Sequence, residues 1–371
     1  MPTENQLSQL TIRGFKSIRE LNCLGLGSLN VFVGANGAGK SNLLSFFRML
    51  RALMEGNLGD YVVLQNNGIG DLLFNGRKTT SEMFFETTFG SRGYRFKIKP
   101  GADDASFAVT DEARYYDRNK RWWELGDSGN GKSKLVKEVK SGTRDSQYSA
   151  PVYHAICSWW FYHFHDTSAN APMRHSEIVQ DNETLRPNAA NIAPFLLRLR
   201  EEKHDAYQRI LNACRIVVPY LDDFLLKPKK IGAAEKVSLS WKTKGSDYPM
   251  QPYHLSDGSI RFICLVTALL QPEPPAAIII DEPELGLHPE AIRLLGELLK
   301  DAAKRTQVIA ATQSPLLLDQ FAIKDIVVVN RKNGQSVFER LKREDYNVWL
   351  EDYSVGELWT NNIIQGGTNH E

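Results

Sequence analysis

VFVGANGAGKSNLL, residues 31–44, is the stretch from which the fold of this chain follows. An apolar run leads into residues 34–41, which fit G-x-x-x-x-G-K-[ST], and apolar residues at helical spacing follow at positions 43, 46, 47 and 50. Glycines let backbone N–H groups turn toward an anion, and the helix adds its positive N-terminal end. The context therefore indicates a phosphate-binding loop and not a chance glycine-rich turn.

The loop predicts ATP and Mg²⁺ as cofactors. Lys40 is expected to reach the β- and γ-phosphates, and Ser41 is expected to hold Mg²⁺. The residues that we expect to contact the nucleotide in this loop are Gly34, Ala35, Asn36, Gly37, Ala38, Gly39, Lys40, Ser41 and Asn42.

Composition narrows the class of protein. The 371 residues are 42% hydrophobic and 24% charged, as in soluble globular proteins, and the net charge of +1 leaves any nucleic-acid contact to a local patch. The four cysteines form no C-x-x-C pair, which disfavours a zinc site or a disulfide framework. No segment resembles a signal peptide or a membrane span. We therefore expect a cytoplasmic protein without membrane contact.

Periodicity predicts an α/β protein. Period-two runs at residues 83–89, 94–98, 107–110, 113–116 and 121–125 predict an antiparallel meander. Residues 148–164 fit a buried strand or a short helix, and residues 185–220 have helical spacing. A helix at 260–270, a buried strand at 276–280, a helix from Pro289 and strands at 308–311 and 326–329 follow. We expect an N-terminal lobe (1–165), a helical inserted lobe (166–250) and a C-terminal lobe (251–371).

A second match to the phosphate-loop pattern, GDSGNGKS, occupies residues 126–133. Its flanks differ from those of the first loop, because residues 121–125 do not form a buried apolar run and residues 134–140 alternate in polarity. We interpret it as a solvated hairpin turn, so Lys132 is not expected to bind nucleotide.

Two further segments carry chemistry. IIIDEP, residues 278–283, places two carboxylates after a buried strand, where Asp281 is suited to hold Mg²⁺ and Glu282 to polarise the attacking water. LSDGS, residues 255–259, opens the next helix. Such a turn is a common helix N-cap, but its hydroxyl and backbone N–H groups also suit an anion. Ser256, Asp257 and Gly258 are thus a candidate second phosphate contact.

GFKS (14–17), GANGAGKSN (34–42), LSDGS (255–259) and IIIDEPELGLHP (278–289) together resemble the heads of SMC/RecF-type ABC ATPases, most closely the compact AAA-15/AAA-21 group without a coiled coil. The resemblance implies a P-loop NTPase of the ABC/SMC-head type. An antiparallel β lobe and a helical lobe would lie between the P-loop (Walker A) and the signature motif LSDGS.

The resemblance also implies an ATP-sandwich homodimer. The P-loop and Asp281–Glu282 (Walker B) of one copy would face the signature of the other copy, with residues 285–288 as the D-loop. Gln313 stands where the family has its switch histidine; it can hydrogen-bond a phosphate but carries no titrating proton. Glu282, Lys40 and Gln313 are the expected catalytic residues, and Lys16 is expected near the nucleotide. Gln147 and the loop at 165–167 are candidates for the Q-loop.

For the biological role, the resemblance suggests an ATP-dependent switch that controls an effector on another chain, such as a nuclease or toxin, in antiphage defence or DNA maintenance. Direct DNA binding in RecF-type repair stays open, because the basic segments at 114–144 and 227–244 suit either nucleic acid or a solvated face. The GFKS opening, Asp257 and Gln313 argue against the ATP subunit of a transporter. His163 and His165 fit ordinary packing or part of a metal site.

Overall fold

A computed structural model describes residues 5–117, 121–129 and 131–364 of the chain. A mixed six-stranded sheet forms its centre, with all neighbours parallel except the pair β16 and β17. In sheet order the strands are β17 (Gln335–Arg340), β16 (Ile326–Lys332), β3 (Leu29–Val33), β15 (Gln307–Thr312), β14 (Ala277–Asp281) and β8 (Trp159–Tyr162). Because β3, β15 and β14 are parallel neighbours, their carboxyl ends lie side by side. In open α/β sheets, ligands bind at the carboxyl ends of the strands.

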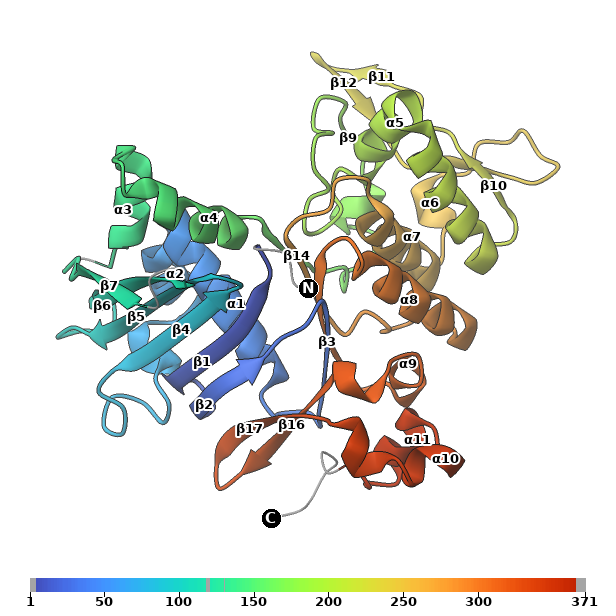
Figure 1. The fold of residues 1–371 in the computed structure, drawn as a ribbon. Coiled ribbons are helices and arrows are strands. Elements are labelled where there is room, and N and C mark those ends of the chain that lie inside the picture. The colour runs from blue at the N-terminus through green and yellow to red at the C-terminus, as the bar shows by residue number, and fades with distance from the viewer. Residues whose placement is uncertain (1–4, 118–120, 130, 365–371) are drawn as a thin grey trace.

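The second sheet is fully antiparallel and confirms the predicted meander (Figure 1). Its strands are, in order, β2 (Ile18–Gly25), β1 (Leu7–Phe15), β4 (Met83–Phe89), β5 (Arg92–Pro100), β6 (Phe107–Tyr116) and β7 (Arg121–Gly126). The two runs expected at 107–110 and 113–116 form the single strand β6. A register shift separates its two halves, and Asp111 has φ 51 between them.

Helix α1 (Lys40–Glu55) packs between the two sheets. Phe46 stacks on Phe85 of the antiparallel sheet, with ring centroids 5.3 Å apart, whereas Phe47 meets the edge of Trp159 in the mixed sheet at 5.4 Å. Each of these four aromatic side chains is fully buried. The predicted helical face at 43, 46, 47 and 50 is therefore real, and both sheets hold the helix that follows the P-loop.

The other helices confirm most of the remaining predictions. The segment at 148–164 contains both proposed elements, a helix and then the edge strand β8. Helices α5–α8 pack on the face of the mixed sheet opposite α1 (Figure 1). The bounds are α2 (Leu58–Asn66), α4 (Ser146–Cys157), α5 (Ile192–Glu202), α6 (His204–Val217), α7 (Asp257–Leu270), α8 (Pro289–Ala302), α9 (Pro315–Leu318), α10 (Trp349–Asp352) and α11 (Val355–Thr360).

Short strands complete the region between β8 and α7. They are β9 (Glu177–Ile178), β10 (Leu221–Phe224), β11 (Lys229–Ile231), β12 (Ala234–Val237) and β13 (Trp241–Thr243). The central sheet draws β3 and β8 from the first 165 residues and its other strands from the C-terminal part of the chain. The lobe limits given above remain predictions, and two of those lobes share this sheet.

The hairpin expected around residues 126–133 is wrong. Strand β7 leads into helix α3 (Lys134–Ser141), so this loop too lies between a strand and a helix. Leu135 and Val136 are buried and Val139 is partly buried, so the three side chains lie on one face of the helix. Leu135 and Val139 alone also fit the period of a strand, but Val136 between them does not. Asn130 lies outside the described residues.

An internal carboxylate occupies the start of α3. Glu112 of β6 is fully buried, and its carboxylate accepts hydrogen bonds from the hydroxyl of Tyr94 at 2.7 Å, the hydroxyl of Ser133 at 2.8 Å and the backbone N–H of Lys134 at 2.7 Å. It therefore takes the position that a phosphate would take at a helix N-terminus. Burial, together with the Glu112 charge, raises the pKa of Tyr94 well above its usual value, which keeps that hydroxyl a donor.

Glu112→Gln is expected to destabilise the fold by about 1–3 kcal/mol, because an amide NH₂ group then faces donors that need an acceptor. Glu124→Gln on the exposed neighbouring strand is the matched control and should change the free energy of unfolding by less than about 0.5 kcal/mol. Urea denaturation of both variants measures the difference. Equal midpoints for the two variants would contradict the capping role.

Candidate nucleotide site

The P-loop connects β3 to α1 and depends on two glycines in particular. A Cβ on Gly34 would lie 2.3 Å from the carbonyl oxygen of Val329, and Gly39 has φ 117 with no room for a side chain beside Ser336. The side chain of Lys40 folds back on this loop, where Nζ donates to the carbonyl oxygens of Gly34 at 2.6 Å and Ala35 at 3.2 Å. Burial lowers the pKa of Lys40, and the nearby acidic side chains oppose that shift.

A cavity of about 140 Å³ opens over the P-loop. It is lined by Asn36, Gly37, Gly39, Lys40, Ser41, Asn42 and Glu282. The structure thus brings most of the predicted loop residues together with the expected catalytic carboxylate, although 240 positions separate Glu282 from Asn42 in the sequence.

The two Walker B carboxylates lie directly beside the loop. Ser41 Oγ is 3.4 Å from Asp281 Oδ2, so both predicted Mg²⁺ ligands face the same point. Burial and the charge of Glu282 raise the pKa of Asp281, an environment in which a bound cation favours the charged carboxylate. Glu282 has φ 43, an uncommon conformation for a residue with a side chain, at the turn that leaves β14.

Gln313 connects the end of β15 to this site. Its Nε2 donates to Glu282 Oε1 at 2.5 Å and to Asn36 Oδ1 at 2.8 Å. Next to it, Glu284 accepts from the hydroxyl of Thr312 at 2.5 Å, and burial raises the pKa of Glu284. Gln313, which we expect at the switch position, therefore holds the carboxylate of Glu282 in this structure.

Lys16 occupies a separate cavity of about 500 Å³, which shares Asn42 with the P-loop cavity. Its Nζ donates to Asn66 Oδ1 at 2.8 Å. The link to the P-loop runs through Ser17, whose Oγ accepts from Asn42 Nδ2 at 2.6 Å and lies 2.6 Å from Ser336 Oγ. The GFKS turn thus braces the first turn of α1.

The signature segment begins α7. Ser256 is the N-cap, and its Oγ accepts from the backbone N–H of Ser259 at 3.1 Å. None of Ser256, Asp257 and Gly258 is among the described residues that line the P-loop cavity. Within one chain, the predicted phosphate contacts therefore fall into two separate places.

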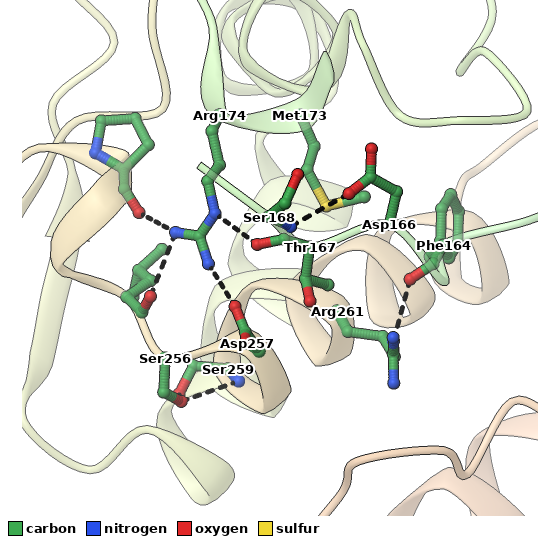
Figure 2. A network of polar contacts seen from close by, with 12 residues as sticks. Phe164, Asp166, Thr167, Ser168, Met173, Arg174, Ser256, Asp257, Ser259 and Arg261 are labelled. Carbon is green, nitrogen blue, oxygen red and sulfur yellow. Dashed lines mark hydrogen bonds and ion pairs between the residues drawn. The ribbon is translucent and has the colours of Figure 1, made fainter. Parts of the chain in front are cut away.

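Two arginines that the sequence reasoning missed hold the signature helix (Figure 2). Arg174 donates to the carbonyl oxygens of Thr167, Pro252 and Leu255 and to the carboxylate of Asp257. In the sequence Arg174 is a single basic residue nine positions after His165, with no motif of its own. The other arginine, Arg261, follows Ser256 by five positions, inside the apolar helix expected at 260–270.

Arg261 joins three segments. It donates to the carbonyl oxygens of Phe164 at 2.8 Å and His165 at 2.8 Å and to that of Leu285 in the predicted D-loop. Gly286 at φ 73 leaves space for the guanidinium, since a Cβ there would lie 2.9 Å from it. The loop after β8, the signature helix and the D-loop are consequently one bonded unit.

The loop after β8 also reaches Walker B, because His165 Nε2 lies 2.9 Å from the carbonyl oxygen of Asp281. This is the loop proposed for the Q-loop place, whereas the other candidate, Gln147, is exposed on α4. His163 and His165 lie with ring centroids 4.3 Å apart. Among the described residues no three His, Cys, Asp or Glu side chains are grouped so that they could hold a metal ion.

Comparison with protein-family models matches residues 29–319 to the family AAA_21, described as "AAA domain, putative AbiEii toxin, Type IV TA system". The chain belongs to the AAA_21 family. A comparison with curated proteins gave no match. The family match agrees with the P-loop ATPase class that the motifs predict. The matched residues extend from the start of β3 to just beyond α9.

Solved structures show that the fold is that of SMC heads. An Smc head bound to the C-winged helix domain of ScpA matches with a TM-score of 0.55 at 16% identity, over 92% of this chain and 99% of that chain. An Smc head from Pyrococcus furiosus, with an extended coiled coil and bound to the C-terminal domain of ScpA, matches at 0.54 and 15%, over 93% and 98%. A Pyrococcus yayanosii head with a coiled coil and joint matches at 0.50 and 13%, over 93% and 99%.

In the described part of this AAA_21 protein, every helix is too short or too polar to span a lipid bilayer.

The two phosphate-loop patterns are expected to respond differently to loss of their lysines. Lys40→Ala should reduce the affinity for Mg·ATP by at least about 100-fold, since Lys40 supplies the charge that faces the phosphates. Lys132→Ala should leave the affinity unchanged within about twofold, because Glu112 fills the start of α3. Fluorescence titration with a labelled ATP analogue measures both, and an equal loss in the two variants would contradict the assignment.

Proposed function

We propose that this protein is an ATP-hydrolysing switch whose two copies close head to tail around two ATP molecules. The observation that carries the proposal is the division of the phosphate contacts. Lys40, Ser41 and Glu282 line one cavity, and the start of α7 lies outside it. A site divided in this way is complete only when a second copy supplies the signature segment.

Binding in the first half would begin at the P-loop. Lys40 would exchange its bonds to the Gly34 and Ala35 carbonyls for phosphate oxygens, which are stronger, charged acceptors. Ser41 and Asp281 are the residues that fit Mg²⁺, because a hydroxyl and a carboxylate 3.4 Å apart are oxygen ligands of the kind this cation prefers. When bound, Mg²⁺ would neutralise charge on the phosphates.

Hydrolysis would need Glu282 to be released from Gln313. The bond between them occupies Oε1, one of the two oxygens with which Glu282 can accept a proton from water. Gln313 would turn its amide toward the terminal phosphate and free the carboxylate. The amide of Gln313 does not titrate between pH 5 and 8, so Gln313 cannot transfer a proton during hydrolysis as a histidine could. We therefore propose slow turnover.

Closure would be transmitted through the loop after β8. His165 contacts the Asp281 carbonyl, and Arg261 ties the same loop to the signature helix and to Leu285. A shift at Walker B on nucleotide binding therefore reaches both segments expected at the dimer interface. We propose that a partner protein responds to the difference between the open and closed states.

The family description supports a toxic or defensive setting, and one of the similar Smc heads is bound to a winged-helix domain of ScpA. In the described part of this chain, the side chains that we expect to carry chemistry lie at the nucleotide site. A nuclease or toxin activity would therefore be supplied by a partner on another chain. We therefore propose an effector-controlling role in antiphage defence or DNA maintenance.

Glu282→Gln should trap the ATP-bound dimer, because an amide cannot take the proton of the attacking water. Light scattering at saturating Mg·ATP should give twice the monomer mass for this variant. The Lys40→Ala, Glu282→Gln double variant is the control and should stay monomeric. A Glu282→Gln protein that binds ATP and yet remains a monomer would contradict the sandwich.

A second candidate function is direct DNA binding, and one groove favours it. Lys132, Lys134, Lys137 and Lys140 line a cavity of about 630 Å³ between α3 and the end of α1. None of the four lysines forms an ion pair with a described residue, and the acidic lining residue Glu55 is paired with Arg51. Four free cations in one groove suit phosphate groups.

The aromatic residues of the same basic segment lie elsewhere. Trp122 packs under Arg95 and Trp123 under Arg121, so neither lines the lysine groove. Without an aromatic platform the groove suits the backbone of duplex DNA better than the bases of a single strand. Residues 118–120 of this segment lie outside the described residues.

Replacing Lys132, Lys137 and Lys140 by Glu should weaken binding to a short DNA duplex by about tenfold or more. The slope of log affinity against log salt concentration should fall by the amount that corresponds to the loss of up to about three phosphate contacts. The same reversal of Lys229, Lys230 and Lys236 on the β11–β12 hairpin is the matched control. Fluorescence anisotropy across a salt series measures both. Equal losses in the two triple variants would indicate a non-specific charge effect and reject the groove.

A further inference from the structure

The signature segment contains a charge that conflicts with its proposed role. Asp257 stands between Ser256 and Gly258 at the start of α7, where the helix end and the serine hydroxyl favour an anion. Its side chain is 73% exposed, so its negative charge faces the region that the partner copy's phosphates would approach. An unpaired carboxylate at this place would repel them.

Arg174 lies directly beside that carboxylate (Figure 2). Its side chain is only 6% exposed, and Nη2 donates to Asp257 Oδ1 at 2.8 Å. Three backbone carbonyl oxygens fix the same guanidinium independently of Asp257. Nε donates to Thr167 at 2.9 Å, and Nη1 donates to Pro252 at 2.7 Å and Leu255 at 3.1 Å.

This arrangement makes Arg174 a built-in counter-charge. A guanidinium stays protonated under all ordinary conditions, and its planar set of donors holds it in one place. Because Pro252 precedes the signature and Leu255 is its first residue, the same contacts also set the course of the chain into α7. The carboxylate of Asp257 is thus the exposed half of a pair whose positive half is buried.

We propose that Arg174 neutralises Asp257 and thereby permits the LSDGS segment to receive the triphosphate of a second copy of this chain. The inference rests on the proposed ATP sandwich. Arg174 acts as a positioning residue, because its donors reach Asp257 and backbone carbonyls and it need not touch ATP. The pair would allow the partner's phosphates to approach a segment that carries an acidic residue.

A purely structural role makes a different prediction. Asp257 lies in the first turn of α7, where any acidic residue stabilises a helix, and Arg174 anchors two loops through carbonyl contacts. If that were the whole role, loss of Arg174 would weaken ATP-dependent dimerisation by the same factor whether residue 257 is Asp or Asn. Neutralisation predicts instead that the factor depends on the charge of residue 257.

A double-mutant cycle in the Glu282→Gln background separates the two roles. The ATP-dependent dimerisation constant is measured by sedimentation for the parent, Arg174→Gln, Asp257→Asn and the double variant. Arg174→Gln should weaken dimerisation by about tenfold, and this loss should nearly vanish when Asp257 is already Asn. An equal loss in both backgrounds, or no loss in either, would overturn the proposal.

Two controls keep the outcome interpretable. Labelled ATP binding to the monomer and thermal unfolding report whether Arg174→Gln is folded with an intact P-loop. Should it fail to fold, Arg174→Lys replaces it, because lysine keeps the charge but cannot contact three carbonyls. Near-parent dimerisation of Arg174→Lys supports neutralisation, and a tenfold loss rejects it. If the parent itself fails to dimerise with ATP, the sandwich fails, and this inference fails with it.

Discussion

The packing of α1 between the two sheets is the constraint on which the rest of the structure depends. Phe46 and Phe47 are adjacent in the sequence, yet each contacts an aromatic residue of a different sheet. The helix can therefore neither rotate nor shift without breaking one of the two contacts. Because Lys40 and Ser41 form its first turn, the geometry of the phosphate loop is set by hydrophobic packing some distance from it.

Electrostatic balance is the second theme of the molecule. Lys40 is the positive charge among Asp281, Glu282 and Glu284, whereas at the start of the signature helix the carboxylate of Asp257 is paired one to one with Arg174. Each half of the proposed site therefore contains groups of both charge signs. At the start of α7 the buried guanidinium of Arg174 has its carboxylate partner within the same chain, so that half carries no unpaired buried arginine while the copies are apart.

The sequence predicts the parts of this fold that local chemistry determines. The P-loop, the strand that ends in Asp281 and the antiparallel meander all have a period or a motif of their own. The bonds of Arg174 and Arg261 have none, because they join segments about 80 to 100 positions apart through backbone carbonyls, which any residue supplies. The helix at 134–141 was missed because Leu135 and Val139, four positions apart, would share one face of a strand as well as one face of a helix.

Glu112 carries a wider consequence. Its carboxylate stands permanently where a strand–loop–helix of this kind would otherwise hold a phosphate. At the second match to the phosphate-loop pattern, the anion at the start of the helix is thus part of the polypeptide. Counting G-x-x-x-x-G-K-[ST] matches would assign two nucleotides to each chain, whereas we predict one.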